Sequence, residues 1–480
     1  MVITLDTSGD TTPSRAAQAA AQAPKKSARH RALEERVAAG KALRDKVPRA
    51  DHGRWIPQEE RPDPIQLLRA DDVNRLPDLV PIRYGRMMAS PFAFYRGTAA
   101  IMASDLANTP ATGLRVQACG DCHLMNFGGF ATPERNILFD INDFDETLPA
   151  PWEWDIKRLA TSFVLAARSL SLADGKAWDA AATCARSYRT RLVEFSDMHP
   201  LDLWYARVTA QDIMDLLPPG RRAHVQARID KATQQLGSEV DFPKLADMVS
   251  GQLGIHDTPP LIFHPDTSRE PDFEARLDRI FNAYAETLPQ ELHILLDEYR
   301  RIDAAIKVVG VGSVGRACWI VLLMSASNQP LFLQVKEATA SVLEPYAGKS
   351  EYPHHGQRVV MGQRLTQPAS DLFLGWTTSD DGRHFYVRQL RDAKIKPLVE
   401  TFDAKTMMLY AKACGWALAR AHAKAGEAAG IAGYLGSGGT FDEAMGDFGL
   451  AYADQAERDY AALKAAARHG DIVAYQEASA

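Results

Sequence analysis

One stretch of the sequence, residues 306–336, limits the possible folds more than any other. It contains runs of β-branched and apolar residues that indicate strands, at Lys307–Val309, Ala317–Met324 and Leu331–Val335. The first two runs are separated by Gly310-Val311-Gly312-Ser313-Val314-Gly315. A dinucleotide-binding fold places such glycines between a strand and a helix. Here a strand follows them, so the sequence predicts a glycine-rich β-hairpin instead.

The last of these runs leads directly into Lys336. A glycine hairpin followed by a strand that ends in lysine is typical of the small lobe of kinases, where both contact the phosphates of a nucleotide. This interpretation predicts the nucleotide-binding residues Gly310, Gly312, Ser313, Gly315 and Lys336. Kinases also pair the lysine with a helix glutamate, and Glu344 and Glu351 are both candidates. An ordinary flexible hairpin with a surface lysine is the alternative.

A second group of polar residues lies between positions 119 and 145. Asn126 follows Asp121 by five positions, and Asp143 ends a later strand-like run. Phosphoryl transfer needs a carboxylate near the attacking hydroxyl and magnesium ions that neutralise phosphate charge, and magnesium prefers oxygen ligands. We therefore expect ATP and Mg²⁺ as cofactors. The predicted catalytic residues are Asp121, Asn126, Asp143 and Lys336, and the predicted metal ligands are Asn126, Asp143 and Asp145.

Other interpretations of this segment stay open. Its acids could form a polar turn that caps nearby helices. Cys119 and Cys122, spaced as Cys-x-x-Cys, could bind a metal or act in redox chemistry. His123 is expected to hydrogen-bond within the loop. A metal-dependent hydrolase would use the acids of 121–145 and would not need Lys336.

The segment resembles the aminoglycoside-phosphotransferase and choline-kinase branch of the kinase-like superfamily. That branch carries His-Gly-Asp-x-His-x-x-Asn, followed by Ile-Asp-Phe-x-Asp and Trp-Asp-Leu-Ala. The matching residues here are Gly120-Asp121-x-His123-x-x-Asn126, Asp143-Phe144-Asp145 and Trp154-Asp155-Ile156. The resemblance implies that Asp121 is the catalytic base, that Asn126 and Asp143 bind magnesium, and that Asp155 is structural. Cys119 stands where that branch usually has histidine.

The two groups occur in the reverse of the usual kinase order, because Asp121 precedes Gly310 by 189 positions. A circular permutation accounts for this order. The helix expected over 403–425, which contains His422, is the element that should directly precede a strand such as Leu114–Ala118. Domain termini often lie close together, so such a rearrangement is tolerable. The predicted fold class is α+β: a circularly permuted, two-lobed protein-kinase-like fold with a small β-rich nucleotide lobe and a large helical lobe.

The whole arrangement also resembles the bacterial family of unknown function called DUF2252, over about residues 40–470. The motifs that carry the resemblance are Pro91-Phe92-x-Phe94-Tyr95-Arg96-Gly97, Gly120–Gly128, Asn142–Glu146, Gly310–Gly315, Gln334–Ala338, Gln357–Arg364 and Tyr452–Gln455. This resemblance implies a family and leaves the substrate open.

Arg83, Arg86 and Arg96 lie in an apolar, helical segment with Met87 and Phe94. Arginines in such a segment need acidic partners or a phosphate, because an unpaired buried charge is costly. These arginines are therefore expected either to pair with acidic residues or to contact a phosphate.

The pattern along the chain predicts a disordered arm at 1–30, helices and the catalytic loop at 31–300, the β-rich lobe at 301–400 and closing helices at 401–480. The arm has almost no bulky apolar residues that could bury enough surface to order it. Helices are expected over 31–48, 152–235, 273–299, 354–366, 403–425 and 442–468, and strands over 371–377 and 384–390. Pro218-Pro219-Gly220 should interrupt the second helical region.

Composition excludes several classes of partner. With 55 basic and 61 acidic residues the net charge is −6, and there is no long basic run, so no nucleic-acid partner is expected. No apolar run reaches the roughly 20 residues of a membrane span, and the N-terminus lacks a secretory pattern. The five cysteines do not form a disulfide framework. We expect a cytoplasmic protein without membrane contact.

The residues together predict an ATP- and magnesium-dependent phosphotransferase, or a relative that transfers another part of the nucleotide. Its acceptor, a small molecule or a protein, has no recognisable code in the sequence. A pseudokinase-like regulatory protein that binds the nucleotide without turnover is one alternative, and the metal-dependent hydrolase is the other.

Overall fold

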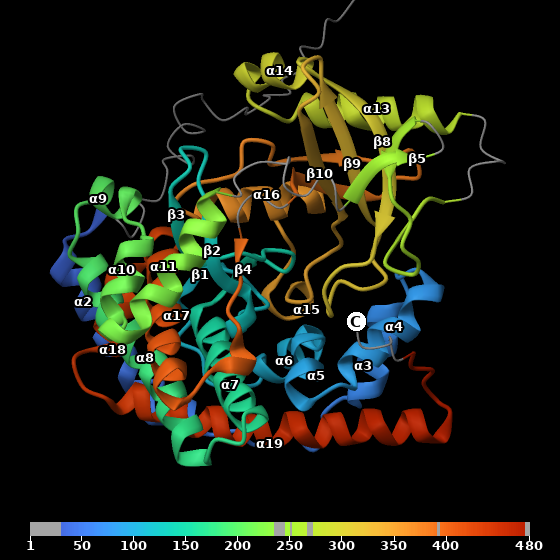
Figure 1. Ribbon diagram of the computed structural model, residues 1–480. Coiled ribbons are helices and arrows are strands. Elements are labelled where there is room, and N and C mark those ends of the chain that lie inside the picture. The colour runs from blue at the N-terminus through green and yellow to red at the C-terminus, as the bar shows by residue number, and fades with distance from the viewer. Residues whose placement is uncertain (1–29, 235–244, 250–251, 266–271, 391–393, 476–480) are drawn as a thin grey trace, which may run out of the picture.

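The computed structural model describes residues 30–234, 245–249, 252–265, 272–390 and 394–475. The arm predicted at 1–30 lies outside the described residues except for its last residue. Helices make up 54% of the chain and strands 15%, in several small sheets, which confirms a mixed α and β class. A helical body and a sheet-containing body pack side by side (Figure 1). Among the described residues, no helix combines the length and apolar composition needed to cross a bilayer.

Long helices with apolar faces build the helical body. They are α7 (Trp152–Ser169), α8 (Asp174–Ser196), α17 (Ala404–Ala425), α18 (Ala428–Leu435) and α19 (Thr440–His469). Small residues let α8 and α17 approach closely, since a Cβ placed on Gly415 would lie 2.2 Å from the Cys184 carbonyl oxygen. The apolar face of α7 is buried in the core through Trp154, Leu159, Phe163 and Leu165.

Shorter elements complete this body. They are α2 (Leu33–Ala42), α9 (Pro200–Tyr205), α10 (Ala210–Leu216), α11 (Pro219–Gln234), β1 (Arg115–Ala118), β2 (Phe127–Ala131), β3 (Ile137–Ile141), β4 (Leu148–Pro151) and β13 (Lys394–Ile395). Strand β1 pairs with β4, and β2 lies between β13 and β3. The helical region expected over 152–235 is therefore five helices, and the last begins at the predicted break.

A six-stranded antiparallel sheet, in the order β11-β12-β10-β9-β8-β7, forms the centre of the other body. Its strands are β7 (Ile262–Phe263), β8 (Tyr299–Lys307), β9 (Cys318–Ser325), β10 (Pro330–Glu337), β11 (Gly375–Thr378) and β12 (His384–Gln389). Two helices, α13 (Phe273–Ala285) and α14 (Gln290–Asp297), cover one face (Figure 1).

Alternation along β10 sends its side chains to opposite faces of this sheet. Leu331 and Leu333 pack toward α13 and α14. Phe332 packs on the other face, beside the hairpin of β5 (Ala246–Val249) and β6 (Gln252–Ile255). Lys336 shares the face of Phe332, because the two residues are four positions apart. This periodicity points Lys336 away from the covering helices.

Several expected elements around the sheet are confirmed. Strands β9 and β10 coincide with the expected runs, α16 (His355–Thr366) matches the helix at 354–366, and the β11–β12 hairpin turns at residues 380–382. The single helix expected over 273–299 is wrong, since Pro289 separates α13 from α14. Strand β8 ends at Lys307, where the sequence predicted a strand to begin, because polar residues in 299–303 hid its first half. The same sheet also includes β7, at Ile262–Phe263.

Short helices fill the space between the glycine hairpin and α19 (Figure 1). They are α3 (Pro64–Asp72), α4 (Val80–Met87), α5 (Pro91–Arg96) and α6 (Ala99–Leu106). Met87 and Phe94 are buried with Leu463 of α19, and Val311 of the hairpin packs against the same cluster. The hairpin is thus supported by the N-terminal part of the chain.

A buried ion pair joins the C-terminal and N-terminal parts of the helical body. Arg420 of α17 lies 2.6 Å from Asp140 of β3, and the two side chains are 0% and 1% exposed. The same guanidinium donates to the Thr366 carbonyl oxygen. Burial raises the pKa of Asp140 even though Arg420 opposes the shift, so the carboxylate depends on its partner.

We expect Arg420→Ala to lower the free energy of unfolding by about 3–5 kcal/mol, because it leaves a buried carboxylate unpaired. Urea denaturation measures this change. The matched control is Arg54→Ala, because Arg54 is 76% exposed and makes a long ion pair, 3.9 Å, with Asp51. This control should change the free energy of unfolding by less than about 0.5 kcal/mol. A loss in Arg420→Ala no larger than in the control would contradict the role assigned to this pair.

Candidate active site

The loop that carries Asp121 leaves β1 through a glycine in a conformation that other residues rarely adopt. Gly120 has φ +82, and a Cβ there would lie 2.3 Å from the Glu146 carbonyl oxygen. Both the backbone angle and the close approach of the 142–147 segment therefore require glycine. This packing brings the Asp121 loop and the segment that carries Asp143 and Asp145 together.

Asp155, at the start of α7, holds the same loop. Its carboxylate accepts hydrogen bonds from the backbone amides of Cys119 (2.7 Å) and Gly120 (3.1 Å). His422 of α17 lies 3.2 Å from the same carboxylate and 2.9 Å from the Tyr188 hydroxyl. Asp155 and His422 are 1–2% exposed, so both brace the loop from inside the core, as expected for a structural aspartate.

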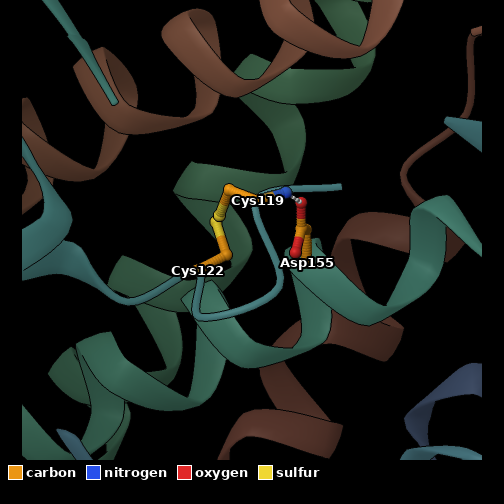
Figure 2. A group of neighbouring side chains, drawn as sticks. All are labelled: Cys119, Cys122 and Asp155. Atoms are coloured by element: carbon orange, nitrogen blue, oxygen red, sulfur yellow. Dashed lines mark hydrogen bonds between the residues drawn. The ribbon is translucent and has the colours of Figure 1, made fainter. Parts of the chain in front are cut away.

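The Cys119–Cys122 pair lies beside Asp155, as Figure 2 shows. Their potential donor atoms lie within 4.8 Å of one another. Burial raises the pKa of both thiols, so they stay protonated, and buried thiols of this kind are inert. The Asp155 oxygens are already used by the loop amides. This geometry favours a packed, structural role for the cysteines over metal binding or redox chemistry.

One cavity of about 100 Å³ is lined by both predicted groups of residues. From the N-terminal half it is lined by Asp71, Arg75, Arg96, Gly97, Ala99, Ala100, Asp121, His123, Asn126, Asp143, Asp145 and Glu146. From the C-terminal half it is lined by Gly310, Val311, Gly312, Ser313, Arg316 and Val342. Gly315 and Lys336 lie just outside this lining, and Lys336 reaches it through Asp145.

Asp121 is oriented by an arginine that the sequence analysis missed. Arg158 Nε and Nη2 lie 2.7 Å and 2.5 Å from Asp121 Oδ1. Within the described residues the Oδ2 atom accepts no hydrogen bond, and His123 Nε2 lies 3.7 Å from it. Burial raises the pKa of Asp121, although Arg158 and Arg96 oppose the shift. One oxygen is thus fixed, and the other can accept a proton. Arg158 stands three residues after Asp155, and this helical spacing was the available signal.

Asn126 and Asp143 present oxygens that suit a hard cation. The Asn126 amide nitrogen donates to the Asp121 carbonyl oxygen at 2.7 Å, which leaves its side-chain oxygen for the cavity. Among the residues that the structure describes, Asp143 Oδ1 accepts a single long hydrogen bond, 3.2 Å, from the Asp145 amide. Burial and the neighbouring Asp145 both raise the pKa of Asp143. A carboxylate in such surroundings gains most from a bound cation, and carboxylate and amide oxygens are ligands that magnesium accepts.

Asp145 is engaged in a different way. Its Oδ2 lies 2.7 Å from Lys336 Nζ, and its Oδ1 accepts a 2.6 Å hydrogen bond from the Tyr386 hydroxyl. Burial alone would raise the pKa of Asp145, but Lys336 lowers it well below the usual range. Both oxygens have partners, so in this state Asp145 is less available to a metal than Asn126 or Asp143.

The ion pair of Lys336 differs from the pairing expected with Glu344 or Glu351. Lys336 pairs with Asp145, while Glu351 is exposed and Glu344 Oε1 is buried without a hydrogen-bond partner among the described residues. Helix α16, the second helix after β10, presents Arg358 to the 142–147 segment. Its guanidinium donates to the Asp145 and Thr147 carbonyl oxygens. A carboxylate of the 142–147 segment thus occupies the place expected for a helix glutamate.

The glycine hairpin is held from the N-terminal side. Arg75 Nη1 donates to the carbonyl oxygens of Gly312 (2.7 Å) and Val314 (2.6 Å). Arg86 Nη1 donates to the Gly310 carbonyl oxygen at 2.6 Å, and the Leu76 amide donates to Gly315 at 2.7 Å. These contacts fix the hairpin over the acids.

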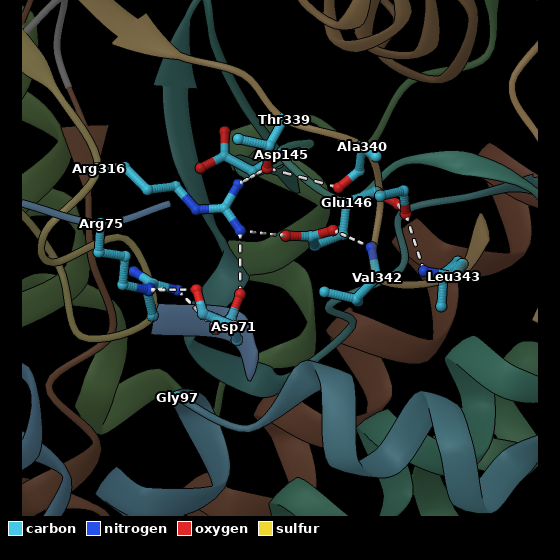
Figure 3. A network of polar contacts seen from close by, with 12 residues as sticks. Asp71, Arg75, Gly97, Asp145, Glu146, Arg316, Thr339, Ala340, Val342 and Leu343 are labelled. Atoms are coloured by element: carbon cyan, nitrogen blue, oxygen red, sulfur yellow. Dashed lines mark hydrogen bonds and ion pairs between the residues drawn. The ribbon is translucent and has the colours of Figure 1, made fainter. Parts of the chain in front are cut away.

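Charged residues connect three segments that meet at the cavity, namely residues 71–97, 142–147 and 310–343 (Figure 3). Arg316 lies 3.5 Å from Asp71 and 3.7 Å from Glu146, and the Val342 amide donates to Glu146 at 2.8 Å. Arg83 pairs with Asp71 and Asp72 at 2.7 and 2.5 Å, so structural pairing is correct for this arginine. Asp71, Arg75 and Arg316 were not predicted, because the contacts that join Asp71 and Arg75 to the 312–316 segment span 237–245 positions in the sequence.

The Lys336–Asp145 pair should make stability depend on acidity. Since the folded pKa of Asp145 is lowered, its contribution is present above the unfolded pKa of about 3.9 and declines as the pH falls below it. Asp145→Asn should lower the free energy of unfolding by about 3 kcal/mol at pH 7, and the deficit should shrink below about pH 4. Urea unfolding from pH 7 down to the lowest pH at which both proteins fold measures this. A deficit that does not change with pH would refute the assignment.

Comparison with known proteins identifies the family. The model for an uncharacterized protein conserved in bacteria (DUF2252) matches residues 75–466, which is well over half of the chain. Searches of curated proteins and of solved structures each found no significant match. The matched range contains the Asp121 loop, the glycine hairpin and Lys336. The chain therefore belongs to the DUF2252 family.

Proposed function

We propose that this protein is an ATP- and magnesium-dependent phosphotransferase whose kinase-like site is assembled from circularly permuted halves. The observation that carries the proposal is the shared cavity. Asp121, Asn126 and Asp143 line it together with Gly310 and Gly312, although Asp121 and Gly310 are 189 positions apart. Two unrelated half-motifs would have no reason to meet.

The order of elements in the sheet-containing body supports a kinase-like nucleotide lobe. In protein kinases a glycine-rich loop covers the phosphates, the lysine lies on the third strand, and a helix that controls this lysine follows. Here the glycine hairpin joins β8 to β9, Lys336 lies on β10, and the four-residue helix α15 (Glu344–Ala347) and then α16 follow. Arg358 of α16 contacts the segment that pairs with Lys336.

The junction between α17 and β1 supports the permutation. In an unpermuted chain the end of α17 should lead directly into β1. A Cβ placed on Gly426, the residue after α17, would lie 2.4 Å from Val116 of β1 and 3.1 Å from the Arg115 carbonyl oxygen. The end of the helix and the strand are therefore in contact, so a short connection between them would be possible.

In the proposed reaction an acceptor hydroxyl attacks the γ-phosphorus of ATP. The bond from the γ-phosphorus to the β–γ bridging oxygen breaks, and ADP leaves. The hydroxyl proton passes to Asp121 Oδ2, the oxygen that Arg158 leaves free. Asn126 and Asp143 are the residues that would hold magnesium, which neutralises phosphate charge. Lys336 would turn from Asp145 to the phosphates.

The described state is closed. Ligand pockets usually have volumes of about 300–1,000 Å³, whereas this cavity has about 100 Å³. The hairpin therefore has to lift away from the acids before a nucleotide can enter. The contacts that Arg75 and Arg86 make with hairpin carbonyls would resist this movement.

Binding of ATP should raise the melting temperature only when magnesium is present. At a ligand concentration 100-fold above Kd the expected stabilisation is about 2.7 kcal/mol. Asp143→Ala should abolish the magnesium-dependent part of the shift, because it removes a predicted ligand. The control, Asp454→Ala, changes an acid whose side chain is 54% exposed on α19 and should leave the shift intact. An unchanged shift in Asp143→Ala would refute the metal assignment.

Turnover separates the proposal from its alternatives. Asp121→Asn should keep the MgATP-dependent stabilisation and lower kcat by about 10²–10⁴-fold, the usual contribution of a general base. A pseudokinase-like protein would bind MgATP and show no turnover with any acceptor even in the wild type. A metal-dependent hydrolase would keep full activity in Lys336→Met, whereas the proposed phosphotransferase would lose most of its activity.

A further inference from the structure

Arg96 differs from the other arginines that line the cavity. Arg75 donates to hairpin carbonyls and pairs with Asp71, and Arg316 lies between Asp71 and Glu146. Arg96 has no hydrogen bond or ion pair within the described residues, and its Nε is buried without a partner. It stands at the end of α5 and lines the cavity.

The electrostatic surroundings of Arg96 leave it in need of an anion. Burial lowers its pKa, and Asp121 is the acid that opposes this shift. Asp121 itself is already paired with Arg158. Arg96 is half-buried, and a partly desolvated guanidinium without its own carboxylate is costly, so a ligand with negative charge would be stabilised here.

The start of α6 lines the same part of the cavity through Ala99 and Ala100. This eight-residue helix has Thr98 at its N-cap, but the threonine side chain makes no capping bond and donates to the Tyr95 carbonyl oxygen instead. The first amides of α6 therefore keep free N–H groups, and the helix dipole favours an anion beside them.

His123 gives an independent indication of a ligand. Its side chain lines the cavity and is only 4% exposed, yet its Nδ1 is buried without a partner among the described residues. An imidazole nitrogen that carries a hydrogen can donate one hydrogen bond to a ligand. Arg96, the α6 amides and His123 thus offer hydrogen-bond donors in one corner.

We propose that this corner binds an oxyanion, a phosphate or a group like it, that belongs to the acceptor. The inference rests on the proposed function and names its substrate class: a hydroxyl compound that already carries an anionic group. Arg96 also lies close to the hairpin, since a Cβ on Gly312 would lie 3.2 Å from the Arg96 carbonyl oxygen, so competition with MgATP decides between an acceptor anion and the phosphates of ATP. Arg158 and Arg96 are cations that act on Asp121, the proposed base, whereas Lys336 and Arg388 act on Asp143 and Asp145.

Inorganic phosphate is a suitable probe, titrated against the melting temperature of the full chain with chloride as the reference anion. Phosphate should stabilise the wild type, and Arg96→Gln should weaken its binding by about 10–100-fold, the loss of a charged hydrogen-bond donor. Arg54→Gln changes an exposed arginine and should bind phosphate like the wild type. If Arg96→Gln does not fold, Arg96→Lys, which keeps the charge and loses the fork of donors, should bind about 3–10-fold more weakly.

A second titration, with MgATP at saturation, decides which ligand the corner serves. A phosphate shift that persists and remains dependent on Arg96 supports an acceptor site. A phosphate shift that disappears assigns the corner to the nucleotide itself and overturns the inference, as does phosphate binding that Arg96→Gln leaves unchanged. If MgATP does not bind the wild type, the phosphotransferase function fails, and an Arg96-dependent phosphate shift then shows an anion site without the acceptor role.

Discussion

The ion pair between Lys336 and Asp145 sets how the sheet-containing body meets the catalytic loops. Both side chains are mostly buried, at 6% and 18% exposure, and their atoms lie 2.7 Å apart. Charges in such surroundings must be paired, so the lysine strand and the 142–147 segment can approach only in a register that joins these groups. Arg358 reinforces this register by donating to the Asp145 and Thr147 carbonyl oxygens. This alignment places Asp143, Asp145 and Glu146 in the lining of the cavity.

The same pair shows what a bound nucleotide would have to change. On the proposed function, Lys336 would pair with a nucleotide phosphate in the way that it now pairs with Asp145. Entry of a phosphate would release Asp145 from Lys336 and leave a carboxylate beside Asp143, where two like charges repel. A cation held near Asp143 would relieve that repulsion. Nucleotide and magnesium are therefore expected to bind cooperatively, since each removes a cost that the other creates.

Local patterns predicted most of the elements that surround the site. The β9 and β10 strands, α16, and the Asp121 and glycine segments could be predicted because each depends on neighbouring residues. The partner of Lys336 could not, since Asp145 lies 191 positions away. The first half of β8 was missed because its polar residues resemble the end of a helix. The role of Arg158 was missed because its helical spacing from Asp155 does not reveal that it turns toward Asp121.

The partners of the arginines around the cavity distinguish arginines that support the fold from one that is available to a ligand. Arg75, Arg83 and Arg158 each have a carboxylate within 2.7 Å, and these pairs join elements that must stay together for the loops to keep their shape. Arg96 makes no such pair within the described chain, although it is held in the same cluster of short helices. A guanidinium kept in a partly closed cavity without a carboxylate contributes nothing to folding that would repay its desolvation. That imbalance is the physical reason to propose a ligand for Arg96, and the effect of Arg96 on Asp121, the proposed base, favours an anionic group of the acceptor.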